Sequence, residues 1–191
     1  MKNKSKRDDI LKAALELITE RGFHGAPMAM LAKKAGIAAG TIYIYFESKD
    51  ALIDELYREL EDKLIAAIMA GYPIKKSIKK KFLHIGTAVL KYFIANPLFF
   101  RYLEQYHNSP YGVSVRRDHM QGKSGNPNAF RDIIEEGISQ KVLKDLPINV
   151  HFALAFGPIL TVARDHVLGL APISDSIIVK TIEACWDGIK K

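Results

Sequence analysis

The sequence predicts an all-α fold with about nine helices, and two observations carry that prediction. Apolar residues recur at spacings of three and four along most of the 191 residues, as on one face of an amphipathic helix. Turn residues separate these segments, and the alternation typical of a strand is confined to residues 41–46. With 48% hydrophobic and 26% charged residues, the composition is that of a globular protein.

The first helix is expected at residues 5–22. Its apolar residues lie on one face: Ile10, Leu11, Ala14, Leu17 and Ile18. Ser5 and Asp8 have the spacing of a capping box, which would place the beginning of the helix at Ser5. Gly22 is expected to end it, because glycine adopts the left-handed conformation common after a helix.

A short helix and a long helix are expected next, separated by residues 37–47. Pro27 suits the first turn of the short helix MAMLAKKAG, residues 28–36, which Gly36 would close. Its inward residues are expected to be Met28, Leu31 and Ala32. The long helix is expected at residues 48–70, with this apolar stripe: Leu52, Ile53, Leu56, Tyr57, Leu60, Leu64, Ile65 and Ile68.

Five further helices are expected in the rest of the chain. Their ranges are 74–95, 97–107, 128–143, 149–169 and 174–189. Residues 108–127 contain Ser-Pro, Tyr-Gly, Gly-Lys-Ser-Gly and Asn-Pro, which are typical of turns. A long loop is therefore expected there, with at most one helical turn inside it.

The segment most informative about function is IAAGTIYIYFESKDAL, residues 37–52. A lone strand here would leave its backbone donors and acceptors unpaired between helical neighbours. As a helix beginning near Ala39, the segment turns Ile42 and Phe46 towards the core. Thr41, Tyr43 and Ile44 then face outward. Two short helices joined by a tight turn make a helix-turn-helix, whose second helix can enter the major groove of DNA.

The same residues closely resemble the N-terminal DNA-binding domain of the TetR family of transcriptional regulators. The matching motifs are Gly22-Phe23, LAKKAGI at 31–37, GTIYIYF at 40–46 and SKDAL at 48–52. The resemblance covers about residues 7–55. It implies a helix-turn-helix DNA-binding domain at residues 1–47 and a larger helical effector-binding and dimerisation domain at 48–191.

The resemblance also implies which residues contact a double-stranded DNA operator. Thr41, Tyr43 and Lys49 would bind phosphates, and Thr41 could also reach a base edge. Ala39, Gly40 and Ile44 would face the floor of the groove, where the Ile44 side chain could contact a thymine methyl group. Residues 37–46 lack Arg, Lys, Asn and Gln, so specificity is expected to rest on methyl contacts and DNA shape.

Two departures from the family pattern concern the helix N-termini. Family members usually carry Thr near position 26 and Ser near position 38, where this chain has Ala26 and Ala38. Losing a capping side chain costs about 1 kcal/mol. The two short helices are therefore expected to begin less firmly or to be capped in another way.

An aromatic cluster is the candidate site for a small-molecule effector. The predicted ligand-binding residues are Tyr92, Phe93, Phe99, Tyr102, Tyr106, Phe130 and Phe156. Ligand pockets are mostly apolar with a few placed polar groups, and tyrosines supply both. Ordinary core packing explains the same residues, so both interpretations stand.

The last two helices are the predicted homodimer interface, again by resemblance to the family. The first carries the apolar residues Phe156, Ile159, Leu160, Ala163 and Val167. The second carries Ile177, Ile178, Ile182, Cys185 and Ile189. Packing within the monomer is expected to use some of them.

Basic residues exceed acidic ones, which gives a net charge of +7 and a pI of about 9.4, and the surplus is spread along the chain. Lys2, Lys4, Lys6 and Arg7 suggest either a basic arm for phosphates or a solvated terminus. The run of five lysines between residues 75 and 81 is read as a solvated helix face.

Other function classes find little support. The six histidines lack metal-site spacing, Cys185 is the only cysteine, and no Ser/His/Asp signature occurs, so neither a metal, a cofactor nor an enzyme is expected. The charged N-terminus is no signal peptide and the apolar run at 152–163 is too short for a bilayer, so a cytoplasmic protein without membrane contact is expected. A repressor is the main hypothesis. The alternatives are an activator and an all-α ligand-binding protein or enzyme without DNA-binding activity.

Overall fold

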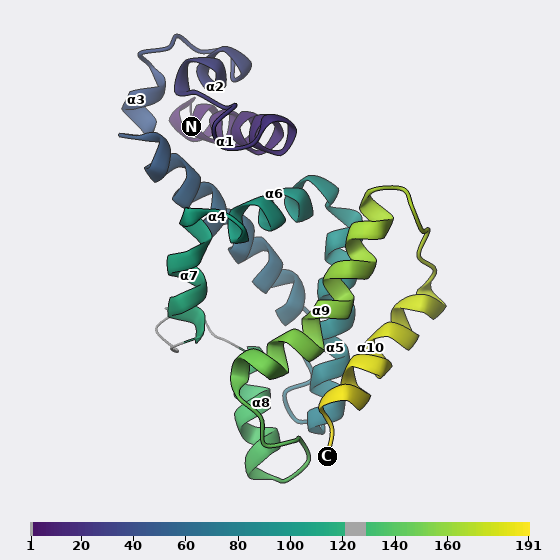
Figure 1. Ribbon diagram of the computed structural model, residues 1–191. Helices are drawn as coiled ribbons and strands as arrows, with labels where there is room; N and C mark the ends of the chain where they lie inside the picture. The colour runs from purple at the N-terminus through teal and green to yellow at the C-terminus, as the bar shows by residue number, and fades with distance from the viewer. Residues whose placement is uncertain (1, 121–128) are drawn as a thin grey trace. The chain divides into compact units, whose positions relative to one another are not determined.

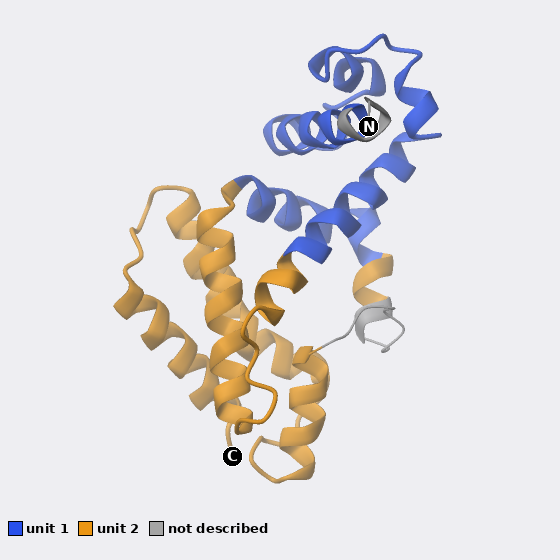
Figure 2. Ribbon diagram, turned by 180° about the vertical axis from the view of Figure 1, so that it is seen from behind, with its two compact units in different colours: residues 1–63, 98–113 blue, residues 64–97, 114–191 orange. Residues whose placement is uncertain are grey.

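The computed structural model describes residues 2–120 and 129–191, and these are all-α as predicted. They form ten helices, α1 to α10 (Figure 1). Across the described residues, the sole β-type pairing is an isolated antiparallel bridge between Leu143 and Lys190. The chain divides into two compact units, coloured in Figure 2: unit 1 is Met1–Lys63 with Leu98–Val113, and unit 2 is Leu64–Pro97 with Ser114–Lys191.

Unit 1 begins with helix α1, Lys2–Arg21, which buries the predicted apolar face. The helix ends at Gly22, which has a φ of 72° and donates its N–H to the Ile18 carbonyl oxygen at 2.8 Å. The predicted end is therefore confirmed. The predicted start at Ser5 is wrong, because the helix runs back to Lys2.

Helices α2, α3 and α4 follow as Met28–Lys34, Ile42–Tyr45 and Lys49–Met69. The Ser48 hydroxyl accepts the Ala51 N–H at 3.0 Å, which caps the N-terminus of α4. The inward stripe of α4 in unit 1 is buried as predicted: Leu52, Ile53, Leu56, Tyr57 and Leu60.

Helix α6, Pro97–His107, packs its aromatic face against α4 within unit 1. The buried Tyr102 donates its hydroxyl to the Ile53 carbonyl oxygen at 3.0 Å. The rings of Tyr57 and Tyr106 stack with centroids 4.1 Å apart. A buried tyrosine whose hydroxyl is hydrogen-bonded contributes both buried apolar area and a hydrogen bond. These two contacts hold α4 and α6 together, although the helices are far apart in sequence.

Helix α7, Pro110–Met120, occupies much of the predicted loop, and that prediction is wrong for these residues. Pro110 stands at the first helical position, where its fixed φ and missing N–H favour a helix start rather than a turn. The Tyr111 ring lies 5.2 Å from the Phe23 ring, and its hydroxyl donates to Asp50 at 2.8 Å. Residues 121–128 of the predicted loop lie outside the described residues.

Unit 2 is built around helix α5, Ile78–Ala95, which packs against α8, α9 and α10. These are Ala129–Ser139, Ile148–Val167 and Asp175–Ile189. Helix α5 begins four residues later than predicted, because Ser77 caps it by accepting the Lys80 N–H at 3.4 Å. Among the described helices, no single one is long and apolar enough to cross a bilayer. Helices α5 and α6 together have sufficient length and apolar composition, but the chain bends by 107° between them.

Gly86 lets α5 approach α10 closely, which gives a test of the packing in unit 2. A Cβ at Gly86 would lie 2.8 Å from Ile182 Cγ2, whereas a Cβ at Gly188 in α10 would meet no atom within 4 Å. We expect Gly86→Ala to lower the free energy of unfolding by about 1 kcal/mol, because overpacking outweighs the gain in helix propensity. The matched Gly188→Ala should raise it by up to about 1 kcal/mol. Urea unfolding of the two variants should give opposite signs, and equal signs would contradict this packing.

His151 in α9 is fully buried, and its Nε2 lies 2.9 Å from the Lys144 carbonyl oxygen. Burial lowers the pKa of the imidazole below its ordinary value, although the hydrogen bond to Lys144 opposes that shift. The folded protein therefore takes up this proton at lower pH than the unfolded chain does.

This difference predicts that His151 makes stability depend on pH. The contribution is fully present above the unfolded pKa of about 6.5 and decreases as the pH falls towards the lower folded pKa. Urea unfolding of the wild type and His151→Gln from about pH 8 to about pH 5 checks this. The advantage of the wild type over the variant should shrink at acidic pH, and a constant difference would refute the assignment.

Candidate nucleic-acid interface

Helix α2 packs its apolar face into the core of unit 1, and a tight turn follows it. Its inward residues Met28, Leu31 and Ala32 are buried, as predicted. Gly36 has a φ of 70°, and the Ile37 N–H donates to the Ala32 carbonyl oxygen at 3.0 Å. A left-handed glycine with this hydrogen bond is a common way to end a helix and reverse the chain.

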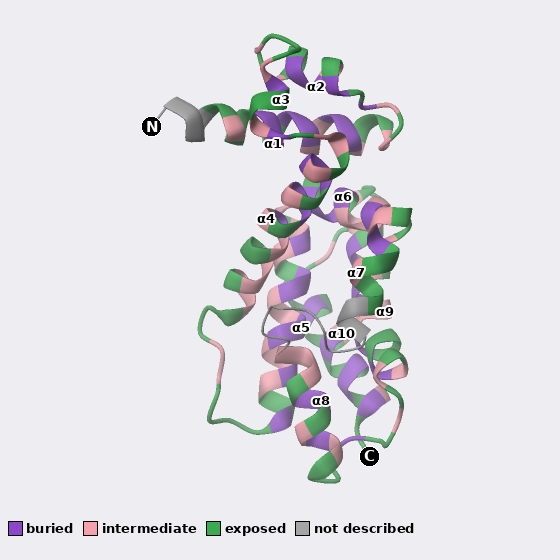
Figure 3. Ribbon diagram, turned by 90° about the vertical axis from the view of Figure 1, so that its left-hand side faces the viewer, coloured by how far each residue is buried: buried purple, intermediate pink, exposed green. Residues whose placement is uncertain are grey.

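Helix α3 has one buried and one exposed face. Ile42 and Phe46 are buried, which confirms the predicted inward side. Figure 3 colours the ribbon by how far each described residue is buried. Tyr43 and Ile44 are 55% and 78% exposed. The predicted start near Ala39 is wrong: the helix begins at Ile42, after a turn in which the Thr41 N–H donates to the Ala38 carbonyl oxygen at 2.9 Å. The segment is helical and not a strand.

The turn and α3 together present what we call the recognition surface, residues 39–41 with Tyr43 and Ile44. Ala39 and Gly40 are exposed and Thr41 is half-exposed. Thr41 occupies the N-cap position of α3, yet its side chain makes no capping hydrogen bond. Five of the six predicted DNA-binding residues are thus exposed or half-exposed in the turn and α3, and the Thr41 hydroxyl is not used to cap the helix.

Lys49, the sixth predicted residue, is half-buried at the start of α4. Its ammonium group donates to the carbonyl oxygen of Phe23, just beyond α1. An ammonium carries three donors, so this bond leaves two others. Sequence analysis did not find the bond, because nothing in the spacing of these residues brings them together.

The two alanines that replace the usual capping residues have different environments. Ala26 is completely buried, next to the N-cap residue Pro27, and α2 has no side-chain cap. Ala38 is exposed and precedes the turn. The N-termini of α2 and α3 are therefore uncapped by side chains, as the sequence indicated.

The predicted ligand-binding residues lie in both units. In unit 1, Phe99, Tyr102 and Tyr106 are buried. Burial, and to a smaller extent the negative charge of Asp54, raises the pKa of Tyr106 to about 12. In unit 2, Phe93 is buried and Tyr92 is half-buried. These side chains belong largely to the packed interior of their own units.

The clearest aromatic cluster in unit 2 is a set of three phenylalanines from α8 and α9. The ring centroids of Phe130 and Phe156 are 4.8 Å apart, as are those of Phe152 and Phe156. Phe152 is exposed and the other two are half-buried. We call these three residues the phenylalanine cluster.

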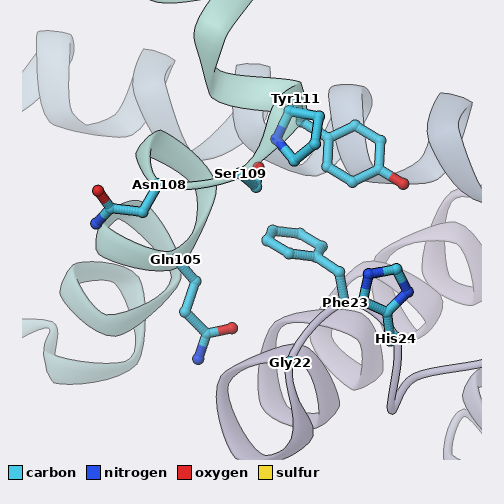
Figure 4. A pocket seen from close by; sticks show the side chains of 8 residues that line it. Gly22, Phe23, His24, Gln105, Asn108, Ser109 and Tyr111 are labelled. Atoms are coloured by element: carbon cyan, nitrogen blue, oxygen red, sulfur yellow. The ribbon is translucent and has the colours of Figure 1, made fainter.

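A cavity of about 600 Å³ opens in unit 1, between the end of α1 and the turn from α6 to α7 (Figure 4). Its lining residues are Gly22, Phe23, His24, Gln105, Asn108, Ser109, Pro110 and Tyr111. None of the predicted ligand-binding residues is among them. Sequence analysis missed this cavity because α1 and α7 meet only in the folded unit.

Metal binding finds no support in the described part of the chain. There, no group of three or more His, Cys, Asp or Glu side chains is placed to hold an ion. Cys185 is buried, and burial raises the pKa of its thiol. A thiol with a raised pKa is a poor nucleophile and ligand.

Comparison with known proteins identifies the family. The family model for bacterial regulatory proteins of the tetR family matches residues 10–56. A model described as a tetracyclin repressor-like C-terminal domain matches residues 77–190, more than half of the chain. The fatty acid metabolism regulator protein of Bacillus subtilis is 27% identical over 177 residues, which cover 88% of this chain and 90% of that protein.

Two solved structures illustrate the likeness of fold. A TetR family transcription regulator from Marinobacter aquaeolei VT8 has a TM-score of 0.86 at 21% identity, covering 100% of this chain and 98% of that one. FadR from Bacillus subtilis, in complex with stearoyl-CoA, has a TM-score of 0.72 at 20% identity, covering 94% and 95%. With both family models matched in order along the sequence, the chain belongs to the TetR family of DNA-binding helix-turn-helix transcriptional regulators.

Proposed function

We propose that this chain is a repressor that binds its operator as a homodimer and leaves it when a small molecule binds. The observation that carries the DNA-binding part is the outward placement of Tyr43 and Ile44 on a helix anchored by Ile42 and Phe46. Two recognition surfaces would enter successive major grooves of a near-palindrome, about 34–36 Å apart. Such a regulator works beside the chromosome, in the cytoplasm.

The recognition surface supports a division of roles among its residues. The Thr41 and Tyr43 hydroxyls and the Lys49 ammonium supply donors for phosphates. Ala39 and Gly40 have small side chains that let the backbone approach the groove, and Ile44 offers an apolar side chain to thymine methyl groups. The surface has no guanidinium or carboxamide group, so sequence readout would rest on methyl contacts and DNA shape.

Ile44 gives the sharpest test of this surface. We expect Ile44→Ala to weaken operator binding roughly tenfold, because a buried methyl contact in the groove is worth about 1 kcal/mol or more. Ile74→Ala is the matched control, since Ile74 in unit 2 is 69% exposed against 78% for Ile44. Fluorescence anisotropy with DNA from the gene's own upstream region measures both.

Two results of that titration would count against the proposal. Equal binding by Ile44→Ala and Ile74→Ala would remove α3 from the interface. Absence of salt-sensitive binding by the wild type would favour the alternative, an all-α ligand-binding protein or enzyme without DNA-binding activity, because phosphate contacts make affinity fall steeply with salt.

The effector is proposed to carry a long acyl chain and to bind in the residue 48–191 region. Two findings support this class. The 27% identical relative is a fatty acid metabolism regulator, and the FadR structure of similar fold holds stearoyl-CoA. In this chain, the partly exposed phenylalanine cluster provides apolar surface for an acyl chain. The other predicted ligand-binding residues would line the site only where they are not used in core packing.

An effector titration tests this class of ligand. Stearoyl-CoA should weaken operator binding at least tenfold, whereas acetyl-CoA, which has the same head group, should not; a ligand acts only through its different affinity for the two forms. Phe130→Ala should raise the stearoyl-CoA concentration needed for release and leave operator binding without effector unchanged. Release by both thioesters alike, or by neither, would exclude a long acyl chain as the recognised group.

The dimer is proposed to form through α9 and α10. Most of the predicted apolar stripe is already buried inside unit 2: Ile159, Ala163, Ile178, Ile182, Cys185 and Ile189. Leu154, Ile177 and Val179 remain exposed on these two helices. Together with Phe152 on α9, they offer exposed apolar side chains to a second copy, which supports an interface through these two helices.

A further inference from the structure

Arg7 in α1 contacts two other parts of unit 1, the end of α3 and helix α4. Its Nη2 pairs with Glu55 Oε1, and its Nη1 lies 3.4 Å from Glu59 Oε2. The guanidinium carbon lies 6.0 Å from the centroid of the Phe46 ring. We call Arg7, Phe46, Glu55 and Glu59 the Arg7 clamp.

The clamp holds the end of the helix that carries the recognition surface. Phe46 directly follows α3 and is buried, whereas Glu55 and Glu59 lie one turn apart on α4. One planar cation therefore contacts α1, the end of α3 and the first half of α4. Arginine suits this role better than lysine, because its fork of donors can bind two carboxylates while its face lies on a ring.

Helix α3 depends on such neighbours for its orientation. It has only four residues, a single turn, and a turn of helix gains too few hydrogen bonds to be stable alone. Its last hydrogen bond, from the Phe46 N–H to the Ile42 carbonyl oxygen at 3.0 Å, lies directly beside the clamp. A shift of Phe46 would move Tyr43 and Ile44 with it.

The two carboxylates would be unfavourable in a DNA-binding unit if they had no other role. Negative charge near the operator repels phosphates and weakens binding. Glu59 also accepts from Lys63 at 2.6 Å. Burial alone would raise the pKa of Glu59, but Lys63 and Arg7 outweigh it and lower that pKa, which keeps the group ionised.

We infer that Arg7 is a positioning residue for operator recognition, which fixes α3 through Phe46, Glu55 and Glu59 instead of pairing with a DNA phosphate. This inference rests on the proposed DNA-binding function. Partly exposed ion pairs contribute little to overall stability, so unit 1 is expected to stay folded without the clamp. The loss should appear in the order of α3 and in operator affinity.

Operator binding over a series of salt concentrations separates positioning from a phosphate contact. Arg7→Met should bind about fivefold more weakly with an unchanged salt slope. The double variant Glu55→Gln/Glu59→Gln should also bind more weakly, although it gains positive charge. Matched controls are Lys12→Met in α1 and Asp62→Asn in α4, whose side chains make no ion pair with the described residues.

The opposite pattern would overturn the inference. A phosphate contact predicts a slope reduced by about 0.9 for Arg7→Met and tighter binding by the glutamine variant, because its Arg7 is released. Changes no larger than those of the controls would also overturn it. The wild-type titration alone reports on the proposed DNA binding, so a failure of that function is recognised separately.

Hydrogen exchange gives a second readout that needs no DNA. The Phe46 amide should exchange several-fold faster in Arg7→Met and in the glutamine variant than in the wild type, while the Gly22 amide at the end of α1 should not change. Unchanged exchange at Phe46 would show that the clamp does not hold α3, whatever the operator titration gives.

Discussion

The orientation of helix α3 depends on two buried side chains. Ile42 and Phe46 are one helical turn apart and both lie in the core of unit 1. A helix of four residues has little stability of its own, so burial of this pair fixes which way α3 faces. Once they are inside, Tyr43 and Ile44 face outward, whereas Tyr45 stays half-buried. The recognition surface is thus set by packing on its opposite side.

The tyrosines of α6 set the second constraint. Tyr102 donates to a carbonyl oxygen of α4, Tyr106 stacks on Tyr57, and Tyr111 at the start of α7 bonds to Asp50. Residues 98–113 therefore belong to the same compact unit as the N-terminal helices, although 34 residues of unit 2, Leu64–Pro97, precede them in the chain. The boundary proposed after residue 47 would separate DNA binding from effector binding and dimerisation. The compact units divide the chain elsewhere, because these aromatic contacts join residues 98–113 to the N-terminal helices.

A net charge of +7 would suggest free cations on the recognition surface, but they are not found there. The recognition surface carries no formal charge. Two cations in its vicinity, Arg7 and Lys49, bind groups of the protein itself: carboxylates of α4 in one case and the Phe23 carbonyl oxygen in the other. These charges stabilise contacts within unit 1, and the recognition surface itself is uncharged.

Local patterns in the sequence were enough to predict the all-α class, the glycines Gly22 and Gly36 that follow α1 and α2, and the inward faces of α2, α3 and α4. Periodicity and turn residues act over a few residues, so they report which face of a helix is buried. Three other features became visible in the folded chain alone: α1 extends past Ser5, Pro110 begins a helix, and Lys49 bonds to Phe23. The tertiary structure also placed the cavity beside Phe23 and used most of the α9 and α10 stripe inside unit 2. Those features depend on segments that are distant in sequence, and a local pattern states that a residue is buried without stating against what.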